Sequence, residues 1–294
     1  MNFLRNNILG WATSRPPTPS TIQPQIMGPS HTNLLFLVLE LLFPFPCTDC
    51  WLCFDVDGPF DCPRTETVQE LARMLDDERV VLVRGTPTSG KSTLARLLDR
   101  YYERHNVPSV CIDSWPQTGY SSFRGILVEQ ARDSGYPWVT RKNLYSCDIV
   151  FIIDEAQMSY HDHGLWLGFV KCQASRYNGP RVCLFCSYGS PSGTTANLGP
   201  GSPVGFIGIQ KRVSLTVSSI PHASSICLFY NRAEIDDTIG RLCCNIRRPL
   251  SLDDDARDYI FDLTNGQPGA VDAIVAVLRQ VRRVIRLCCL CQCQ

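Results

Sequence analysis

One segment of eight residues limits what this chain can fold into more than any other feature of its sequence. Residues 85–92 read Gly-Thr-Pro-Thr-Ser-Gly-Lys-Ser and match the pattern G-x-x-x-x-G-K-[ST]. The segment lies between an apolar stretch, residues 80–83, and a stretch at 92–102 whose leucines recur at helical spacing. A glycine-rich turn between a buried strand and a helix presents backbone N–H groups and the positive end of the helix dipole to an anion. The sequence therefore predicts a phosphate-binding loop.

Two side chains at the end of this loop suit nucleotide chemistry. Lys91 is expected to pair with the β- and γ-phosphates, and the Ser92 hydroxyl to bind Mg²⁺. The alternative is a glycine-rich turn that carries a lysine by accident, but chance matches are expected in roughly a few chains per thousand. The residues expected to contact the nucleotide are Gly85, Thr86, Pro87, Thr88, Ser89, Gly90, Lys91, Ser92 and Thr93.

A second motif supplies two acids. Residues 149–153 are all apolar and are followed directly by Asp154 and Glu155. A phosphate loop needs a metal-binding acid at the end of a neighbouring buried strand, and Asp154 is predicted to hold Mg²⁺. Glu155, one residue further, is predicted to accept a proton from the attacking water as general base. The simpler alternative is a buried strand that ends in a solvated acidic turn.

The sequence around these motifs also indicates which nucleotide is used. Guanine-specific proteins carry an N/T-K-x-D motif, and none of the lysines here is followed two positions later by aspartate. A small-molecule kinase needs neither the glutamate beside Asp154 nor the additional strand predicted at 107–112 between the motifs. We therefore predict an ATPase that uses ATP and Mg²⁺. The alternative is a nucleotide-gated interaction module with little or no turnover, which acts on an unidentified protein partner.

Strands and helices alternate from about residue 57, as in α/β domains with a mainly parallel sheet. A helix is expected at 65–75, ended by the acidic residues 76–78. A Gly-, Ser- and Pro-rich stretch at 189–208 is expected to be a mobile or functional loop. The predicted fold class is an α/β P-loop NTPase of the ASCE type with a parallel five-stranded sheet. Its strands are predicted at 80–83, 107–112, 148–153, 181–187 and 212–217.

The C-terminal part has a different pattern, which predicts a small helical lid after the sheet. Ser251 is the expected N-cap of a helix that ends at Leu263, with acidic residues in its first turn. After a break at 265–266, Pro268 lies near the start of a second helix that runs to about Arg286. The predicted parts of the chain are a poorly packed arm at 1–56, the P-loop domain at 57–245, the helical lid at 246–287 and a Cys-rich tail at 288–294.

Composition argues against other classes of function. The 28 basic and 28 acidic residues cancel, so no overall charge draws the chain to nucleic acid or to an anionic membrane. The apolar stretch at 34–45 contains Glu40 and is shorter than the roughly 20 residues that span a membrane. It also follows a proline-rich segment, unlike a secretory signal. These features predict an intracellular protein.

The sixteen cysteines are interpreted as reduced thiols, because their spacing is scattered over a long chain. Metal binding by the cysteines at 47, 50, 53 and 62 is the less favoured alternative, since their spacing lacks a second well-formed Cys pair or a histidine partner. His161 and His163 are interpreted as solvated. The arginines at 279–286 and the cysteines at 288–293 fit a basic helix end better than an acylated membrane anchor.

Several strings of residues resemble known ATPases. Residues 63–66, the phosphate loop, 154–157 and 266–268 together resemble the AAA+ and STAND-type ATPases. Longer strings resemble the NTPase module of fungal Crinkler-type proteins, namely 57–64, 115–116, 154–160, 187–191 and 228–230. This resemblance implies an ATPase module often joined to a ubiquitin-like header and a nuclease-like toxin domain, and secretion into a host cell. Neither end of the chain resembles those additional domains, so an effector activity is not expected of it alone.

The resemblance implies roles for residues outside the two motifs. Arg64, before the first helix, and Pro268, in the Gly-x-Pro turn, are implied to contribute to cofactor binding. Ser187 corresponds to a polar sensor whose hydroxyl orients the attacking water, and a satisfied strand-end serine is the alternative. An arginine finger supplied by a second copy would require a homo-oligomer. The candidates for it, each also consistent with an ordinary surface arginine, are Arg212, Arg247 and Arg248.

Overall fold

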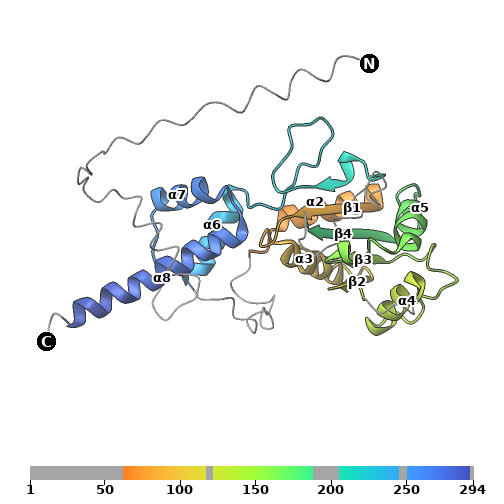
Figure 1. Ribbon diagram of the computed structural model, residues 1–294, viewed down its shortest axis with the longest axis horizontal. Coiled ribbons are helices and arrows are strands. Elements are labelled where there is room, and N and C mark those ends of the chain that lie inside the picture. The colour runs from red at the N-terminus through yellow and green to blue at the C-terminus, as the bar shows by residue number, and fades with distance from the viewer. Residues whose placement is uncertain (1–61, 117–121, 188–204, 245–249, 292–294) are drawn as a thin grey trace, which may run out of the picture. The chain divides into compact units, whose positions relative to one another are not determined.

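The computed structural model describes residues 62–116, 122–187, 205–244 and 250–291, with side chains as far as residue 281. Five parallel strands form one sheet in the order β2-β3-β4-β1-β5 (Figure 1). The predicted α/β fold class with a five-stranded parallel sheet is therefore confirmed. The strands are β1 (Val80–Gly85), β2 (Ser109–Ile112), β3 (Val150–Ile153), β4 (Arg181–Ser187) and β5 (Arg212–Val213).

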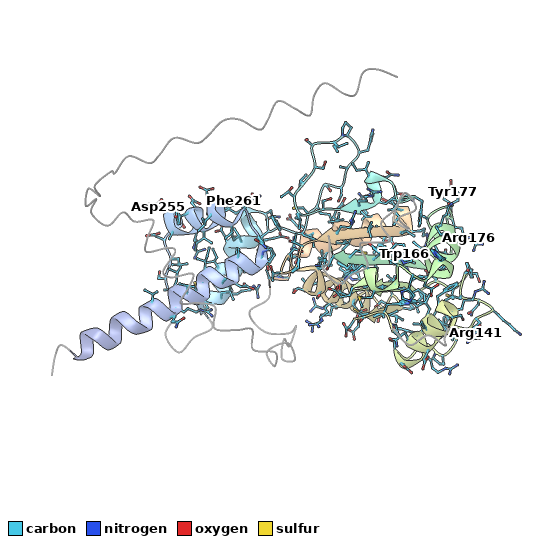
Figure 2. All side chains as sticks on the ribbon, in the orientation of Figure 1. Arg141, Trp166, Arg176, Tyr177, Asp255 and Phe261 are labelled. Carbon is cyan, nitrogen blue, oxygen red and sulfur yellow. The ribbon has the colours of Figure 1, made fainter. Side chains whose placement is uncertain are left out.

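The sheet is buried on both faces, as a parallel sheet requires. Successive side chains of a strand point to opposite sides, and those of β1 alternate between two apolar clusters. Helices α2 (Thr65–Glu78) and α3 (Lys91–Arg104) cover one face. Helix α4 (Phe123–Asp133) and the π-helical segment Gly164–Val170, followed by α5 (Lys171–Gln173), cover the other. Trp166 of that segment is fully buried (Figure 2).

Because the strands are parallel, their C-terminal ends lie at one edge of the sheet. Gly85, the last residue of β1, pairs in register with Ser187, the last residue of β4. Ile153, at the end of β3, pairs with Leu184 of β4. The phosphate loop follows β1 and the two acids follow β3, so the sheet brings both motifs to the same edge.

Among the helix boundaries that differ from the prediction, two are explained by side-chain contacts. Helix α2 continues through residues 76–78 and ends at Arg79, which has a left-handed φ of 60°. The acidic side chains do not break the helix, because arginines pair with two of them. The N-cap of α7 (Asp254–Thr264) is Asp253 and not Ser251, since the Asp253 carboxylate accepts the backbone N–H of Ala256 at 2.8 Å. A carboxylate in this position satisfies one of the free N–H groups at the helix start.

The edge strand β5 is shorter than the predicted 212–217 and comprises two residues. It pairs with β1 through Arg212 and Val213. Beyond it, Ser214 forms an isolated parallel bridge with Cys227.

Three helices follow the sheet and share an apolar core (Figure 1). They are α6 (Arg232–Cys244), α7 (Asp254–Thr264) and α8 (Pro268–Cys291). The predicted boundary after residue 245 assigns α6 to the sheet domain, but Ile235 and Ile239 of α6 pack with Val271 and Val275 of α8. The helical cluster therefore begins upstream of that boundary. The rest of the predicted division into domains stays a prediction.

Some predicted features lie outside the described residues. These are the arm at 1–56, most of the loop at 189–208, and the tail beyond residue 291. Within the part of the chain that the structure describes, no helix has both the length and the apolar character needed to cross a membrane.

Candidate functional site

The phosphate loop folds tightly between β1 and α3. A Cβ added at Gly85 would lie 2.4 Å from Ser89 Oγ and 2.4 Å from a side-chain carbon of Leu228. Gly90, directly before α3, has a φ of 84°, a left-handed conformation that glycine adopts without steric cost. Both glycines of the motif thus occupy positions that a larger residue would strain.

Ser89 and Lys91 close the loop from within. Ser89 Oγ donates a hydrogen bond to the carbonyl oxygen of Thr86 at 2.8 Å, and Lys91 Nζ donates to the same oxygen at 3.0 Å. Ser89 is fully buried and Lys91 is 5% exposed. An ammonium group has three N–H donors, so this bond leaves donors for an anion held in the loop.

The sheet brings Asp154 to Ser92, at the start of α3. The Asp154 carboxylate accepts a hydrogen bond from Ser92 and another from the backbone N–H of Glu155, at 2.9 Å. Burial raises the pKa of Asp154 above its ordinary value, while these two hydrogen bonds and the charge of Lys91 lower it. A carboxylate beside a hydroxyl is an oxygen donor set, which suits Mg²⁺.

Glu155 is held in an uncommon backbone conformation. Its φ is 47°, in the left-handed region, which costs a residue with a side chain about 1–3 kcal/mol. Gln157 Nε2 donates to Glu155 Oε2, and Gln157 Oε1 accepts the backbone N–H of Ser187 at 3.0 Å. The structure thus places Ser187 beside the acidic motif and joins it to Glu155 through Gln157. The role of the Ser187 hydroxyl stays a prediction.

Both predicted motifs therefore meet at one edge of a parallel sheet, with the glycine-rich loop after β1 and the acids after β3. The fold is an α/β fold with a five-stranded parallel sheet, and this arrangement is the one expected of a P-loop NTPase. A scan against protein-family models finds no match, and neither does a search of curated proteins.

Three solved structures that are similar to this chain are compared with it. A Walker-type ATPase of Pyrococcus abyssi is 15% identical, with a TM-score of 0.43 over 77% of this chain and 73% of that chain. RuvB of Thermotoga maritima is 17% identical, with a TM-score of 0.38 over 76% of this chain and 64% of that chain. The replication initiator DnaA, solved with AMPPCP and single-stranded DNA, is 10% identical, with a TM-score of 0.37 over 74% and 63%. This chain thus covers less than two thirds of the latter two.

These likenesses concern the fold and carry no statement about activity. They give no support to the Crinkler-type resemblance, which stays a prediction. The chemistry of the site has to be argued from its own residues.

The start of α8 lies directly on the phosphate loop of this P-loop fold. Gly269 donates its backbone N–H to the carbonyl oxygen of Thr88 at 3.0 Å. A Cβ at Gly90 would lie 3.2 Å from the ring of Pro268, which places Pro268 against the loop. Gln267 Nε2 donates to Thr88 Oγ1 at 3.4 Å. Pro268 is therefore next to the predicted nucleotide site, and its contact with a cofactor stays a prediction.

Arg64 contacts Glu234 and the segment before α6. Its Nε and Nη2 donate to the carboxylate of Glu234, at 3.1 and 3.2 Å. Its Nη1 and Nη2 donate to the carbonyl oxygens of Leu228 and Cys227, both at 2.9 Å. Arg64 is 4% exposed and thus fixes the segment before α6 to the start of α2. These contacts support a structural role, and cofactor binding by Arg64 stays a prediction.

The arginine-finger candidates and the cysteines form no recognisable site among the described residues. Arg212 Nε donates to the carbonyl oxygen of Ile207 at 2.8 Å, and the other two finger candidates, at 247 and 248, lie outside the described residues. Cys47, Cys50 and Cys53 also lie outside, whereas Cys62 is buried. Among the residues that are described, no group of three His, Cys, Asp or Glu side chains is placed to hold a metal ion.

The sequence interpretation assigned no role to three residues that build the surroundings of the site, namely Gln157, Glu234 and Gly269. Gln157 carries a usable signal, because it follows the acidic pair by two positions and is a polar residue between Ala156 and Met158. Glu234 and Gly269 carry none, since their partners, Arg64 and Thr88, are distant in the sequence.

Proposed function

We propose that this chain binds ATP with Mg²⁺ at the phosphate loop and hydrolyses the terminal phosphate. The hydrogen bond between Ser92 and Asp154 carries the proposal. These residues belong to α3 and to the end of β3, and β3 is separated from β1 by β4. Ser92 and Asp154 therefore meet only in the folded chain. A hydroxyl and a carboxylate in these positions are the side chains with which phosphate-loop enzymes bind Mg²⁺.

The residues fit the implied ligands. A Cβ at Gly85 would collide with Ser89 and Leu228, so glycine allows the tight loop whose backbone N–H groups would bind phosphate oxygens. Lys91 supplies a buried positive charge at its base. Ser92 and Asp154 would hold Mg²⁺, which when bound neutralises charge on the phosphate oxygens. With these oxygen donors the cation would retain several waters.

The remaining chemistry belongs to the chain. Lys91 would exchange its bond to the Thr86 carbonyl for phosphate oxygens, and the start of α3 would add the positive end of its dipole. Glu155 would accept the proton of the attacking water through its carboxylate. The strained backbone at Glu155 supports this role, because such conformations persist where the surroundings hold a functional group in place.

The test compares Lys91→Ala and Glu155→Gln for ATP affinity and for ATP turnover. Lys91→Ala should lose ATP binding, because the buried cation at the phosphate loop is removed. Glu155→Gln should bind ATP normally and turn over at least roughly 100-fold more slowly, the usual effect of a general base. Lys142→Ala and Glu129→Gln, at exposed positions, are the matched controls and should match the wild type. Equal turnover by the wild type and Glu155→Gln would refute the mechanism.

A second candidate function is a nucleotide-gated interaction module, which the contact between Gly269 and Thr88 favours. Because α8 begins on the phosphate loop, occupation of the loop would be transmitted to the C-terminal helices. ATP would then change the surface offered to a protein partner or to a second copy, with little turnover. Mass measurement and limited proteolysis in ATP and ADP, without measurable hydrolysis, would favour this candidate.

A further inference from the structure

One buried glutamine lies directly behind the acidic motif. Gln157 is 6% exposed and belongs to the single-turn 3₁₀ helix Ala156–Ser159, which follows Glu155. Its Nε2 donates to Glu155 Oε2, and its Oε1 accepts the N–H of Ser187 at 3.0 Å. One side-chain amide therefore connects Glu155, just beyond β3, with Ser187 at the end of β4.

The 3₁₀ turn that carries Gln157 is itself firmly held. Ser159 Oγ donates to the carbonyl oxygen of Ala156 at 2.7 Å, and the indole Nε1 of Trp166 donates to Ser159 Oγ at 2.9 Å. Ser159 and Trp166 are both fully buried. The backbone origin of the Gln157 side chain is thus fixed against the core, and the amide has a defined direction.

Glu155, by contrast, has a fixed backbone that does not by itself orient its long side chain. Its left-handed φ places it outside regular structure, and its N–H is already used by the Asp154 carboxylate. A long carboxylate side chain on such a residue has several rotatable bonds. The hydrogen bond from the fixed Gln157 amide therefore sets where the carboxylate points.

We propose that Gln157 is a positioning residue, which orients the Glu155 carboxylate and couples it to the end of β4. The inference rests on the proposed function of Glu155 as general base. It also connects the phosphate loop to Glu155, because Ser187 pairs in register with Gly85 at the start of that loop. A shift of the loop would reach Glu155 through Ser187 and Gln157.

Two substitutions separate the two bonds of the amide. Gln157→Met has nearly the same length and removes both hydrogen bonds. Gln157→Glu retains an acceptor for the Ser187 N–H but replaces the donor to Glu155 with a second carboxylate, which repels it. A merely structural role of Gln157 would make Gln157→Met the more damaging change in stability and would leave kcat untouched in any variant that folds.

The experiment measures kcat and KM for ATP in the wild type, Gln157→Met and Gln157→Glu, and in the double variant with Glu155→Gln. Each single variant should lose at least roughly tenfold in kcat with KM within about twofold, because misplacing a reacting group by about 1 Å costs up to 100-fold. In the Glu155→Gln background, Gln157→Met should have no further effect. Gln173→Met, which removes another fully buried glutamine amide, is the control and should keep the wild-type kcat.

A readout independent of activity is hydrogen exchange at the Ser187 amide. Exchange should accelerate in Gln157→Met, which removes its acceptor, and stay at the wild-type rate in Gln157→Glu. A wild-type kcat in Gln157→Met would overturn the positioning role, as would an equal loss in the Glu155→Gln background. Absence of turnover in the wild type is a separate result, which refutes the proposed hydrolysis and the positioning role that rests on it.

Discussion

Two buried polar clusters near the phosphate loop are assembled in opposite ways. At the end of β3, Asp154, Glu155 and Gln157 are close neighbours in the sequence. The other cluster joins Arg64, before α2, to Glu234 of α6, 170 positions away. The first can be recognised as a motif, whereas the second exists only once the chain has folded.

The two clusters also differ in whether their buried charges are paired. The side chains of Arg64 and Glu234 are 3% and 9% exposed and neutralise each other. Asp154 is buried as deeply, yet its pKa is raised, so the protein by itself disfavours its charged form. In the cluster that maintains the fold, Arg64 and Glu234 neutralise each other. In the proposed ligand site, the carboxylate of Asp154 would instead be neutralised by a bound cation.

The largest expected effect breaks the pair of Arg64 and Glu234. Arg64→Ala should lower the free energy of unfolding by about 3–5 kcal/mol, because it leaves a buried carboxylate without its cation. Arg73→Ala is the matched control. Arg73 is 61% exposed in its pairs with Glu70 and Asp77, and such surface pairs contribute at most about 1 kcal/mol. Urea unfolding monitored by circular dichroism provides the comparison.

Two thiols report which region opens in the Arg64→Ala variant. Burial raises the pKa of Cys62, beside the Arg64 cluster, to about 11, and that of Cys186, in β4, to about 12. Both should react slowly with iodoacetamide in the native protein, because the thiolate is the reactive form. Arg64→Ala should accelerate labelling of Cys62 more than that of Cys186. If Arg64→Ala and Arg73→Ala are equally stable, the buried pair of Arg64 and Glu234 does not maintain the fold.

The second prediction concerns the contact between Gly269 of α8 and Thr88 of the phosphate loop, which is also distant in the sequence. A Cβ at Gly269 would lie 2.6 Å from Thr88 Cβ and 3.0 Å from its carbonyl oxygen. Gly269→Ala should therefore push α8 from the phosphate loop, cost about 1–3 kcal/mol in stability, and weaken ATP binding. Calorimetric titration with ATP measures the latter.

The matched control is Gly240→Ala in α6, where an added Cβ meets no atom within 4 Å. This substitution should stabilise the helix by about 0.5–1 kcal/mol and leave ATP affinity unchanged. Wild-type affinity in Gly269→Ala would show that the contact between α8 and the loop has no part in nucleotide binding.

The same contrast explains how far the sequence predicts this protein. The phosphate loop and the strand before Asp154 follow from local patterns, because spacing and apolar periodicity act over a few residues. The sequence predicts an end of α2 that is too early, because Asp76 pairs with Arg181, which is the first residue of β4 and is distant in the sequence. Helix α6 was not predicted, and its buried Glu234 is explained only by Arg64. Local signals thus locate the reacting groups, and tertiary contacts decide what holds them.

The smallest expected effect concerns the charge at Asp154 in the protein without metal or nucleotide. Because burial raises the pKa of Asp154, its ionised form lowers stability above that pKa, and the penalty disappears as the pH falls toward the ordinary value near 3.9. Asp154→Asn should therefore raise Tm slightly at pH 7 in EDTA, with the difference shrinking on acidification. Asp133→Asn, at an exposed position of α4, is the matched control. A lower Tm for Asp154→Asn at neutral pH would mean that the hydrogen bonds to Asp154 outweigh its burial, so that this carboxylate stabilises the fold as the Arg64 cluster does.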